Sequence, residues 1–384
     1  FCLSRGLGDV YKRQVGWRKL PQIIVSLDQT LPKLEINFIN KKALQILPQE
    51  NKIILENNQE LGYDYLVIAT GPKLNWEVEG SEYINSVCTE KHAINTYNNL
   101  INSIDKVKNI VIGALEGASC FGPAYEFALL LRQELKKRNL YPKISFITPE
   151  PFIGHLGIGG ISNSKQLLTD TLLENNIEIY PNRKILKVEK DKVIFKNPEN
   201  EQTQEIESDF TMLMPRFTGP EVVESAGPKV ANPSNKMVLV NKAFQNQEYK
   251  NIYAVGVVVS IPPIEKTPIP VGVPKTGMMI EQMANAVAHN IINDIINNST
   301  LYTAELSAIC IADFGSGGIG FFLSSITPPR KKELYLKNYF LHHFKTIFEK
   351  YFIWKVKSGN ITPILEEKIV NLFFKTNPII KITS

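Results

Sequence analysis

The sequence predicts a doubly wound α/β fold followed by an amphipathic helical region. Apolar strand patterns alternate with helical patterns from about residue 15 to residue 298, and this alternation is typical of doubly wound α/β halves. Residues 108–138 form the clearest unit, because an apolar strand, a Gly-rich turn and a helix of about four turns follow one another there. After about Asn298 the chain becomes rich in turns, and then in aromatic and lysine residues.

The composition is that of a globular protein with room for two domains. The chain has 384 residues, of which 43% are hydrophobic and 21% are charged, and this length can bury a sizeable core. Its net charge of +5 is modest and no Lys/Arg block alternates with aromatic residues, so nucleic acid is not expected as a partner. No run of about 18 apolar residues occurs, which argues against a membrane-spanning helix.

The opening residues and the cysteines need separate treatment. Residues 1–14 lack the order of a signal peptide and resemble translated sequencing-adapter sequence, so we expect a non-native segment without structure, Cys2 included. Cys88, Cys120 and Cys310 fit neither a disulfide-stapled scaffold nor the spacing of a zinc site. Individually reactive thiols fit these cysteines better.

The elements before the C-terminal region follow from apolar periodicity. Residues 15–100 hold short apolar runs, of which the last forms two strands around a turn and ends on Gly71. After the central unit the pattern predicts strands over 143–150, 177–181, 184–190, 192–197, 210–217 and 251–259, and helices around 164–176 and 273–295.

The C-terminal region carries an aromatic-rich basic helix. Aromatic and apolar side chains recur at three- and four-residue steps with lysines among or beside them, and these are Phe340, Phe344, Ile347, Phe348, Tyr351 and Phe352 with Lys345, Lys350, Lys355 and Lys357. Such a helix either packs on the core or lies in a membrane interface, where lysines meet anionic headgroups. Residues 364–374 supply a second, shorter apolar face.

The Gly-rich turn of the central unit does not match a nicotinamide site. Such a site needs GxGxxG, but Gly113 is followed by Leu115 and Ala118, so a side chain stands where a phosphate would press. Cys120 lies at the helix entrance, where free N–H groups and the helix dipole would stabilise a thiolate, although a small buried cysteine is the alternative. Glu150 ends the next strand as a ribose-binding acid would, so a nucleotide site stays open as a rival.

Several motifs together resemble known flavoproteins. Ala69-Thr70-Gly71, the central unit and the strand ending at Gly256 resemble proteins with two dinucleotide-binding domains. The segments GASCFGPAYEF, EPFIGHLGIGG, PIPVGVPKTG and FEKYFIWKVKSGN closely resemble sulfide:quinone oxidoreductases, from about Val15 to the C-terminus. The resemblance implies FAD as cofactor and two Rossmann-like dinucleotide-binding domains. The opening lacks the family's first strand, GxGxxG turn and helix, so we expect a chain truncated at the N-terminus with an incomplete first domain.

The resemblance also implies a domain division and a membrane-anchoring C-terminal region. The expected parts are a non-native segment (1–14), the first part of the FAD domain (15–105), a second Rossmann-like domain with Cys120 (106–220), the return part of the FAD domain (221–300) and a C-terminal region with Cys310 (301–384).

Site residues are carried over motif by motif. Cys120 and Cys310 resemble a redox pair beside the flavin, joined by a disulfide or a sulfur bridge, and Cys88 resembles an auxiliary cysteine. Glu126 is a candidate for proton handling, and His92 and His155 match positions around the sulfide route, although each could be an ordinary structural histidine. The expected flavin contacts are Ala69, Thr70, Gly71, Gly256, Val257, Lys275, Thr276 and Gly277. The expected quinone contacts are Phe344, Phe348, Lys350, Tyr351 and Phe352.

The resemblance implies a definite chemistry and definite partners. Hydrosulfide would attack the bridging sulfur, leave one thiolate and one persulfide, and the thiolate would react with the flavin, which passes two electrons to quinone. Sulfide, a membrane quinone and the membrane surface are the expected partners, a homo-oligomer is left open, and the expected location is the periphery of a prokaryotic inner membrane.

Three alternatives remain. A type II NADH:quinone oxidoreductase would use NADH and would not need Cys120 and Cys310. The flavoprotein subunit of a flavocytochrome c sulfide dehydrogenase would pass its electrons to a haem partner. An inactive truncated fragment would hold no FAD.

Overall fold

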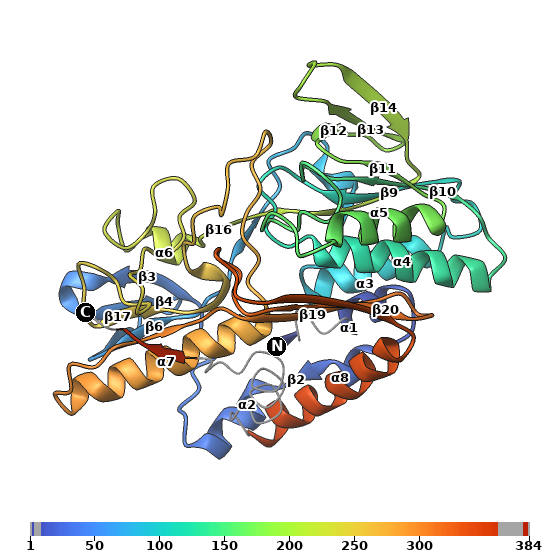
Figure 1. Cartoon of the computed structure of the whole chain (residues 1–384). Helices are drawn as coiled ribbons and strands as arrows, with labels where there is room; N and C mark the ends of the chain where they lie inside the picture. Colours follow the sequence, from blue (N-terminus) through green and yellow to red (C-terminus); the bar gives the residue numbers. More distant parts are fainter. Residues whose placement is uncertain (1, 4–8, 360–378, 383–384) are drawn as a thin grey trace.

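A computed structural model describes residues 2–3, 9–359 and 379–382, and its centre is a five-stranded parallel sheet (Figure 1). In spatial order the strands are β11 (Ile177–Tyr180), β10 (Lys143–Ile147), β9 (Asn109–Ala114), β15 (Phe210–Met214) and β8 (Ile84–Asn85). The helices that pack against it are α3 (Glu90–Ile101), α4 (Gly122–Lys137) and α5 (Ser164–Glu174). The predicted mixed α/β fold is confirmed, whereas the predicted domain boundaries stay predictions.

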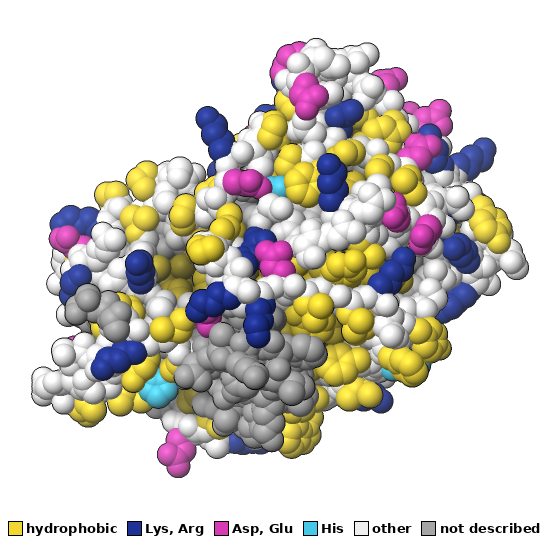
Figure 2. All heavy atoms as spheres, viewed as in Figure 1, with side chains coloured by type: hydrophobic (Ala, Val, Ile, Leu, Met, Phe, Trp, Pro, Cys, Tyr) yellow, Lys and Arg dark blue, Asp and Glu magenta, His cyan; other side chains and the backbone are white. Residues whose placement is uncertain are grey.

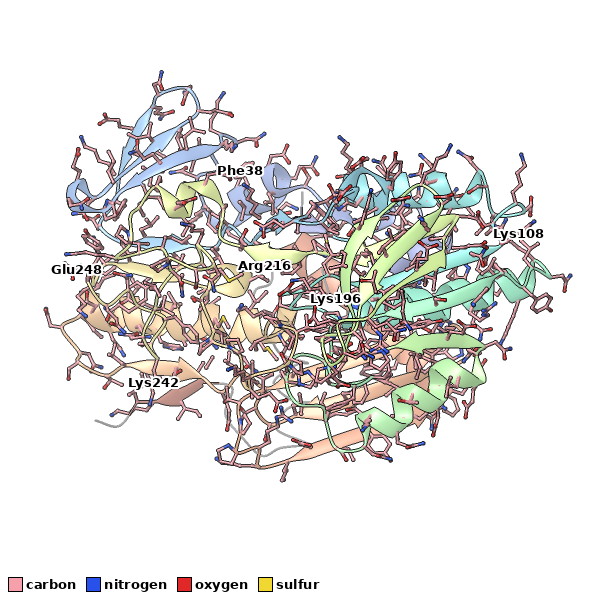
Figure 3. All side chains as sticks on the ribbon, turned by 90° about the horizontal axis from the view of Figure 1, so that it is seen from above. Phe38, Lys108, Lys196, Arg216, Lys242 and Glu248 are labelled. Atoms are coloured by element: carbon pink, nitrogen blue, oxygen red, sulfur yellow. The ribbon has the colours of Figure 1, made fainter. Side chains whose placement is uncertain are left out.

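A second body with its own apolar core lies beside this sheet. Its parallel strands β6 (Leu66–Ile68) and β17 (Ile252–Ala254) are covered by α7 (Gly277–Ile295), and an antiparallel sheet joins them. That sheet consists of β3 (Ala43–Leu47), β4 (Lys52–Leu55) and β5 (Glu60–Gly62). Seen from above, Arg216 lies between the two bodies (Figure 3).

The C-terminal region adds a third layer. Strands β19 (Ala308–Asp313), β20 (Gly318–Leu323) and β21 (Glu333–Asn338) form an antiparallel sheet that lies between α4 and the helix α8 (Phe340–Ser358) (Figure 1). Nearly every side chain of α4 from Pro123 to Leu135 is buried, because two sheets enclose this helix. The helix predicted from Phe340 onwards is confirmed, whereas the apolar face predicted over 364–374 lies outside the described residues.

Short elements complete the fold. One antiparallel sheet is β12 (Lys184–Val188), β13 (Lys192–Lys196) and β14 (Thr203–Glu207). The strand pairs are β7 (Lys73–Asn75) with β16 (Arg216–Thr218), β18 (Tyr302–Ala304) with β22 (Ile379–Lys381), and β1 (Cys2–Leu3) with β2 (Ile24–Val25). The short helices are α1 (Asp9–Gln14), α2 (Leu27–Thr30) and α6 (Glu221–Glu224), and the 3₁₀ turns are η1 (Leu20–Gln22), η2 (Leu31–Leu34), η3 (Pro48–Glu50), η4 (Ser81–Tyr83) and η5 (Gly256–Val258).

Two findings concern the ends of the chain and the membrane. The expectation that residues 1–14 have no structure is wrong for their described parts, because Cys2–Leu3 pair with β2 and α1 packs against α3 and α4. Gln14 is buried, and the Lys12 ammonium lies 3.1 Å from the Asp313 carboxylate. Within the described ranges, no helix combines the length and the apolarity needed to cross a bilayer.

Candidate functional site

Cys120 lies just before α4, two residues ahead of the first helical residue. Phe121 is the N-cap and Pro123 follows within the first helical turn, so Cys120 lies at the helix entrance, as the sequence indicated. Proline favours the first turn because its missing N–H would be unpaired there anyway. The half-buried Cys120 therefore lies beside the N-terminal end of α4, not inside its first turn.

Cys310 lies in the middle of β19, the strand that contacts α4. Burial raises the pKa of the Cys310 thiol to about 11, Lys345 opposes this and Glu126 reinforces it. Part of the residue remains accessible, but the protein removes water from the sulfur. Cys310 thus favours the protonated thiol unless positive charge is added beside it.

A buried ion pair stands beside this thiol. The Lys345 ammonium of α8 lies 2.5 and 2.6 Å from the two carboxylate oxygens of Glu126 of α4, and it donates to the Ile311 carbonyl at 2.6 Å. Burial raises the pKa of Glu126, and Lys345 opposes that shift. The predicted proton-handling carboxylate therefore shares its site with a lysine that the sequence had placed among membrane-surface residues, an assignment that is wrong for Lys345.

The third cysteine is buried at the start of α3. The Ser86 hydroxyl donates to the Cys88 sulfur at 3.5 Å, and Cys88 belongs to the same apolar cluster against which Cys120 and Cys310 pack. His92 lies one turn further along α3, edge-on to Trp76, and lines a polar cavity of about 370 Å³ at the β8 edge of the sheet.

His155 joins two loops that cover the central unit. Its Nδ1 accepts from the Gly157 N–H at 3.1 Å, so the proton of the neutral ring is on Nε2, which donates to Glu265 at 2.7 Å. Burial lowers the pKa of His155, and the Glu265 carboxylate opposes this. The ring is therefore a neutral, oriented link between the loop of residues 151–160 and the loop around Glu265.

Glu150 fixes the loop of residues 151–160 through hydrogen bonds. It is fully buried, and one carboxylate oxygen accepts from the Tyr125 and Thr148 hydroxyls at 2.8 Å each. The other oxygen accepts from the Leu156 N–H at 2.7 Å, and the Tyr125 hydroxyl accepts from the Gly154 N–H at 2.9 Å. Burial raises the pKa of Glu150 to about 7. This geometry uses both oxygens internally and leaves none for a ribose.

The Gly-rich turn is closed by another segment of the chain. Gly117 donates to the Pro270 carbonyl at 2.8 Å, and Gly272 donates to the Ala118 carbonyl at 2.9 Å. A side chain on Gly272 would come within 2.6 Å of the Ser119 Cβ, so the two segments touch. The Leu115 side chain is buried in the core instead of pressing on a phosphate. The turn thus fails as a nicotinamide site for a different reason than the sequence indicated.

The predicted flavin contacts from three distant segments meet. Ala69, Thr70 and Gly71 follow β6, and Gly256 and Val257 follow β17. These parallel strands end at the same edge, which is where open α/β sheets bind ligands. Gly71 and Gly256 have φ values of 70° and 82°, and α7 starts there with Thr276 as N-cap and Gly277 as first residue.

Lys275 directly precedes this helix, and an anionic partner would stabilise its charged form. Burial alone lowers the pKa of Lys275 to about 8, and no ion pair of this lysine occurs in the described part of the chain. An anionic or electron-rich ring edge beside the ammonium would raise the pKa of Lys275 again. The lysine and the two positive-φ glycines fit an isoalloxazine and its ribityl chain.

Helix α8 is amphipathic, but it buries charged side chains and exposes apolar ones. Its buried face carries Lys345 and Lys355, each about 3% exposed, and Lys355 lies 2.9 Å from Glu281 of α7. Its outer face carries Phe340 and Ile347, which are 72% and 66% exposed. Figure 2 shows apolar side chains gathered in this lower region of the molecule.

The predicted quinone contacts divide between the two faces of α8. Phe344 and Phe348 stack with ring centroids 6.4 Å apart, and Tyr351 follows at 6.0 Å. Phe352 lies instead near Lys355, whose ammonium is 5.8 Å from its ring. Lys350 is exposed.

Sequence reasoning missed a second buried carboxylate. Asp313 ends β19, is fully buried, and accepts from His342 Nδ1 of α8 at 2.8 Å. An aspartate after a strand and a histidine on an aromatic helix carry no sequence signal of their contact. Only the packing of α8 on β19 brings them together.

Comparisons with known proteins agree with this arrangement. A family model described as pyridine nucleotide-disulphide oxidoreductase matches residues 19–289. The chain is 54% identical over 368 residues to a sulfide-quinone reductase of Aquifex aeolicus (strain VF5), and the alignment covers 95% of this chain and 85% of that protein.

Solved structures give the same result. The X-ray structure of the sulfide:quinone oxidoreductase from Aquifex aeolicus matches with a TM-score of 0.96 and 52% identity, over 99% of this chain and 90% of that one. The structure of NDH2 from Plasmodium falciparum in complex with NADH matches with a TM-score of 0.70 and 13% identity, over 96% of this chain and 91% of that one. At that identity the second similarity shows a shared fold alone.

Proposed function

Because the chain belongs to the pyridine nucleotide-disulphide oxidoreductase family, we propose that it is a flavin-dependent sulfide:quinone oxidoreductase. The observation that carries the proposal is the 54% identity to the Aquifex sulfide-quinone reductase over 95% of the chain. The chain also keeps two cysteines on elements that pack together, Cys120 before α4 and Cys310 on β19.

NADH is not the electron donor in this proposal. The Pro270–Gly272 segment covers the Gly-rich turn, and both oxygens of Glu150 are used inside the protein. A nicotinamide dinucleotide needs that turn for its pyrophosphate and an acid for its ribose. Both requirements fail here.

FAD is the flavin that the site fits best. Lys275 would lie at the ring edge, the backbone at Gly71 and Gly256 would approach the ribityl chain, and α7 would direct its N-terminal end at the cofactor. When bound, the flavin supplies a two-electron acceptor for sulfide and a donor for quinone. A charged Lys275 would stabilise negative charge on the reduced cofactor.

The cysteine pair handles sulfur. Hydrosulfide would attack one sulfur of a Cys120–Cys310 disulfide, so that one cysteine carries a persulfide and the other leaves as a thiolate. A second hydrosulfide would remove the outer persulfide sulfur as a disulfide ion, and the two cysteines would then give two electrons to the bound flavin as their bridge re-forms. Because burial disfavours a Cys310 thiolate and Lys345 favours it, Lys345 holds positive charge where the thiolate forms, and Glu126 is the nearest group able to hold a proton.

Quinone and membrane are reached through α8. The reversed faces of this helix place aromatic rings outside, where water would be unfavourable and the acyl boundary of a bilayer favourable. We therefore place the protein on the surface of a prokaryotic inner membrane, with Phe344, Phe348 and Tyr351 as the quinone walls. Phe352 and Lys350 stay candidates on neighbouring faces.

The proposal is tested by anaerobic titration of the FAD-loaded protein with sulfide, followed by a short-chain quinone, while flavin absorbance is recorded. Sulfide should bleach the flavin and quinone should restore it. The variants Cys120→Ser and Cys310→Ser should bind FAD but stay oxidised with sulfide, and Cys2→Ser serves as a matched control that should bleach. Bleaching by NADH, or by sulfide in both active-site variants, would overturn the assignment.

A further inference from the structure

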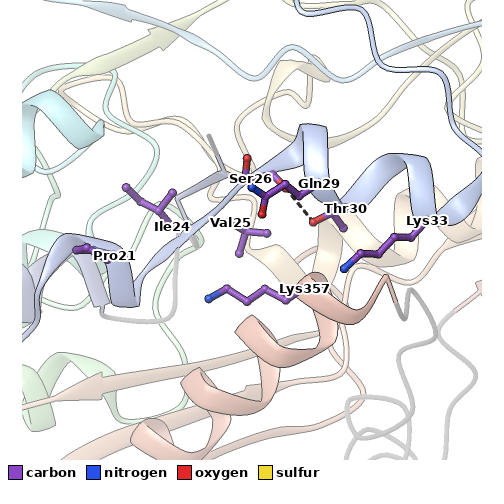
Figure 4. A pocket seen from close by; sticks show the side chains of 8 residues that line it. All are labelled: Pro21, Ile24, Val25, Ser26, Gln29, Thr30, Lys33 and Lys357. Carbon is purple, nitrogen blue, oxygen red and sulfur yellow. Dashed lines mark hydrogen bonds between the residues drawn. The ribbon is translucent and has the colours of Figure 1, made fainter.

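A cavity of about 530 Å³ lies away from the cysteines, between the N-terminal part of the chain and the last turn of α8 (Figure 4). This volume suits a small molecule or a lipid headgroup. Its described walls are Pro21, Ile24, Val25, Ser26, Gln29, Thr30, Lys33 and Lys357. None of these residues belongs to α4, β19 or α7.

The cavity is positively charged. Lys33 and Lys357 come from opposite walls, one after α2 and one from the end of α8 (Figure 4), and none of the described wall residues is acidic. Neither lysine forms an ion pair within the described residues, whereas Lys345 and Lys355 of the same helix are paired with Glu126 and Glu281. Two like charges at one cavity attract an anion.

The ends of the two walls are held in place. The α8 C-cap Gly359 has φ 71°, and a Cβ there would come within 3.0 Å of Leu34, so α8 ends directly against η2. The Thr30 hydroxyl donates to the Ser26 carbonyl at 2.9 Å, which fixes the turn before Lys33. The cavity thus has a fixed frame with two long, movable cations at its mouth.

The polar donors that face the cavity suit a phosphate. Lysine ammonium groups bind phosphate as point charges, and the Gln29 amide is a further donor with no bond to a described side chain. The Ser26 hydroxyl is already bonded to Asp28, which does not line the cavity. Pro21, Ile24 and Val25 form an apolar wall next to these donors, which a free inorganic ion would not use.

We propose that this cavity binds the phosphate of an anionic phospholipid between Lys33 and Lys357, with the glycerol and upper acyl part against Ile24 and Val25. The outer apolar row of α8, which includes Phe340, Ile347 and Trp354, leads along the helix towards Lys357. The phosphate would hold the C-terminal end of α8 at headgroup depth. The choice of a lipid as phosphate source rests on the proposed membrane association.

The test is calorimetric titration of the FAD-loaded full chain with dihexanoyl-phosphatidylglycerol below its micelle concentration. Saturable binding is expected, with an affinity loss of about fivefold for Lys33→Gln and for Lys357→Gln and of about 25-fold for the double variant. Lys106→Gln removes the same charge from another surface, outside the cavity, and should leave the affinity unchanged. All these lysines are exposed, so thermal unfolding should be the same for every variant.

Further arms separate the possible outcomes. Inorganic phosphate should bind more weakly than the lipid, and equal affinity would assign the site to free phosphate and overturn the lipid. No saturable lipid binding, or an equal loss in Lys106→Gln, would overturn the site itself. Sedimentation of the wild-type protein with phosphatidylglycerol vesicles tests membrane association separately, so a failure there is distinguishable from a failure of the cavity.

Discussion

Lys345 of α8 and Glu126 of α4 form a buried ion pair that joins the outermost helix of the protein to the helix that follows Cys120. The two members of the pair act in opposite directions on the pKa of the Cys310 thiol, which Lys345 lowers and Glu126 raises. The pair therefore connects the stability of α8 packing to the chemistry of the cysteine.

Breaking this pair on one side should destabilise the fold strongly. Lys345→Met or Glu126→Gln alone should lower the free energy of unfolding by about 3 to 5 kcal/mol, because the remaining charge stays buried without a partner. The double variant should lose less than the two single losses combined. Urea unfolding measures these free energies. The control Lys337→Gln breaks an exposed ion pair with Glu174, 3.3 Å away, and should change the free energy of unfolding by less than about 1 kcal/mol. Additive losses would contradict direct coupling.

Cys310 should react slowly as a thiol. With its pKa at about 11 in place of 9, the thiolate fraction at pH 8 is about a hundredfold lower than for an ordinary cysteine. In a protein with the other cysteines changed to serine, iodoacetamide labelling followed by mass spectrometry should show this. Glu126→Gln should accelerate labelling and Lys345→Gln should slow it further. Rates equal to a model thiol in all three proteins would refute the charge assignment.

Glu150 should give the protein a pH-dependent stability. The folded state holds a proton on Glu150 up to about pH 7, whereas the unfolded chain releases it near pH 4.5. This contribution is complete below pH 4.5 and is lost as pH rises through about 7, by about 3 kcal/mol in total. The unfolding free energy of the wild type relative to Glu150→Gln should therefore fall over this window. The exposed Glu56→Gln should show no such trend, and a flat difference for Glu150→Gln would disprove it.

Gly272 should tolerate no side chain. A Cβ would lie 2.6 Å from the Ser119 Cβ, so Gly272→Ala must move the covering segment from the Gly-rich turn. We expect a loss of about 1 to 3 kcal/mol, measured by thermal unfolding. Gly62→Ala adds the same methyl group where no atom lies within 4 Å and should be nearly neutral. Equal effects of the two substitutions would argue against close packing at Gly272.

The outer face of α8 should control vesicle binding. Phe340→Ser, Ile347→Ser and Trp354→Ser should each weaken binding by about tenfold or more, because each ring or chain contributes about 1.5 to 3 kcal/mol when it leaves water. Vesicle sedimentation measures this while thermal stability stays unchanged. Tyr141→Ser removes an equally exposed ring, 72% accessible, from another surface and should have no effect. Similar losses at Tyr141 would exclude a specific face.

Local patterns predicted α4, α5, α7 and the parallel strands, because each buries a face whose period can be read from neighbouring residues. The segment expected to be rich in turns after Asn298 instead forms the strands β19, β20 and β21, so that prediction was wrong. Cys120 was expected at the entrance of α4, and Pro123 marks the first turn of that helix. The interfacial alternative allowed an outward aromatic face on α8, but the burial of Lys345 and Lys355 could not be predicted, because lysines normally mark the exposed side of a helix. Lys345 and Glu126 are 219 positions apart, and no local pattern announces their contact.

The predicted flavin contacts were found together because strand ends in a parallel sheet share one edge. The thiol pair could be placed only as far as its supporting elements. Glu150 was considered as a ribose ligand, and its use as an internal support for residues 154–156 became visible only when Tyr125, five residues after Cys120, was found beneath that loop.

The covering of the Gly-rich turn by residues 270–272 determines which electron carriers of the cell the protein can exchange electrons with. A flavoprotein with an open groove exchanges electrons with the soluble nicotinamide pool, in either direction. Here the protein's own backbone contacts the turn, so we expect a nicotinamide dinucleotide to find no room there. Sulfide oxidation by this protein should therefore be independent of the ratio of oxidised to reduced nicotinamide in its surroundings.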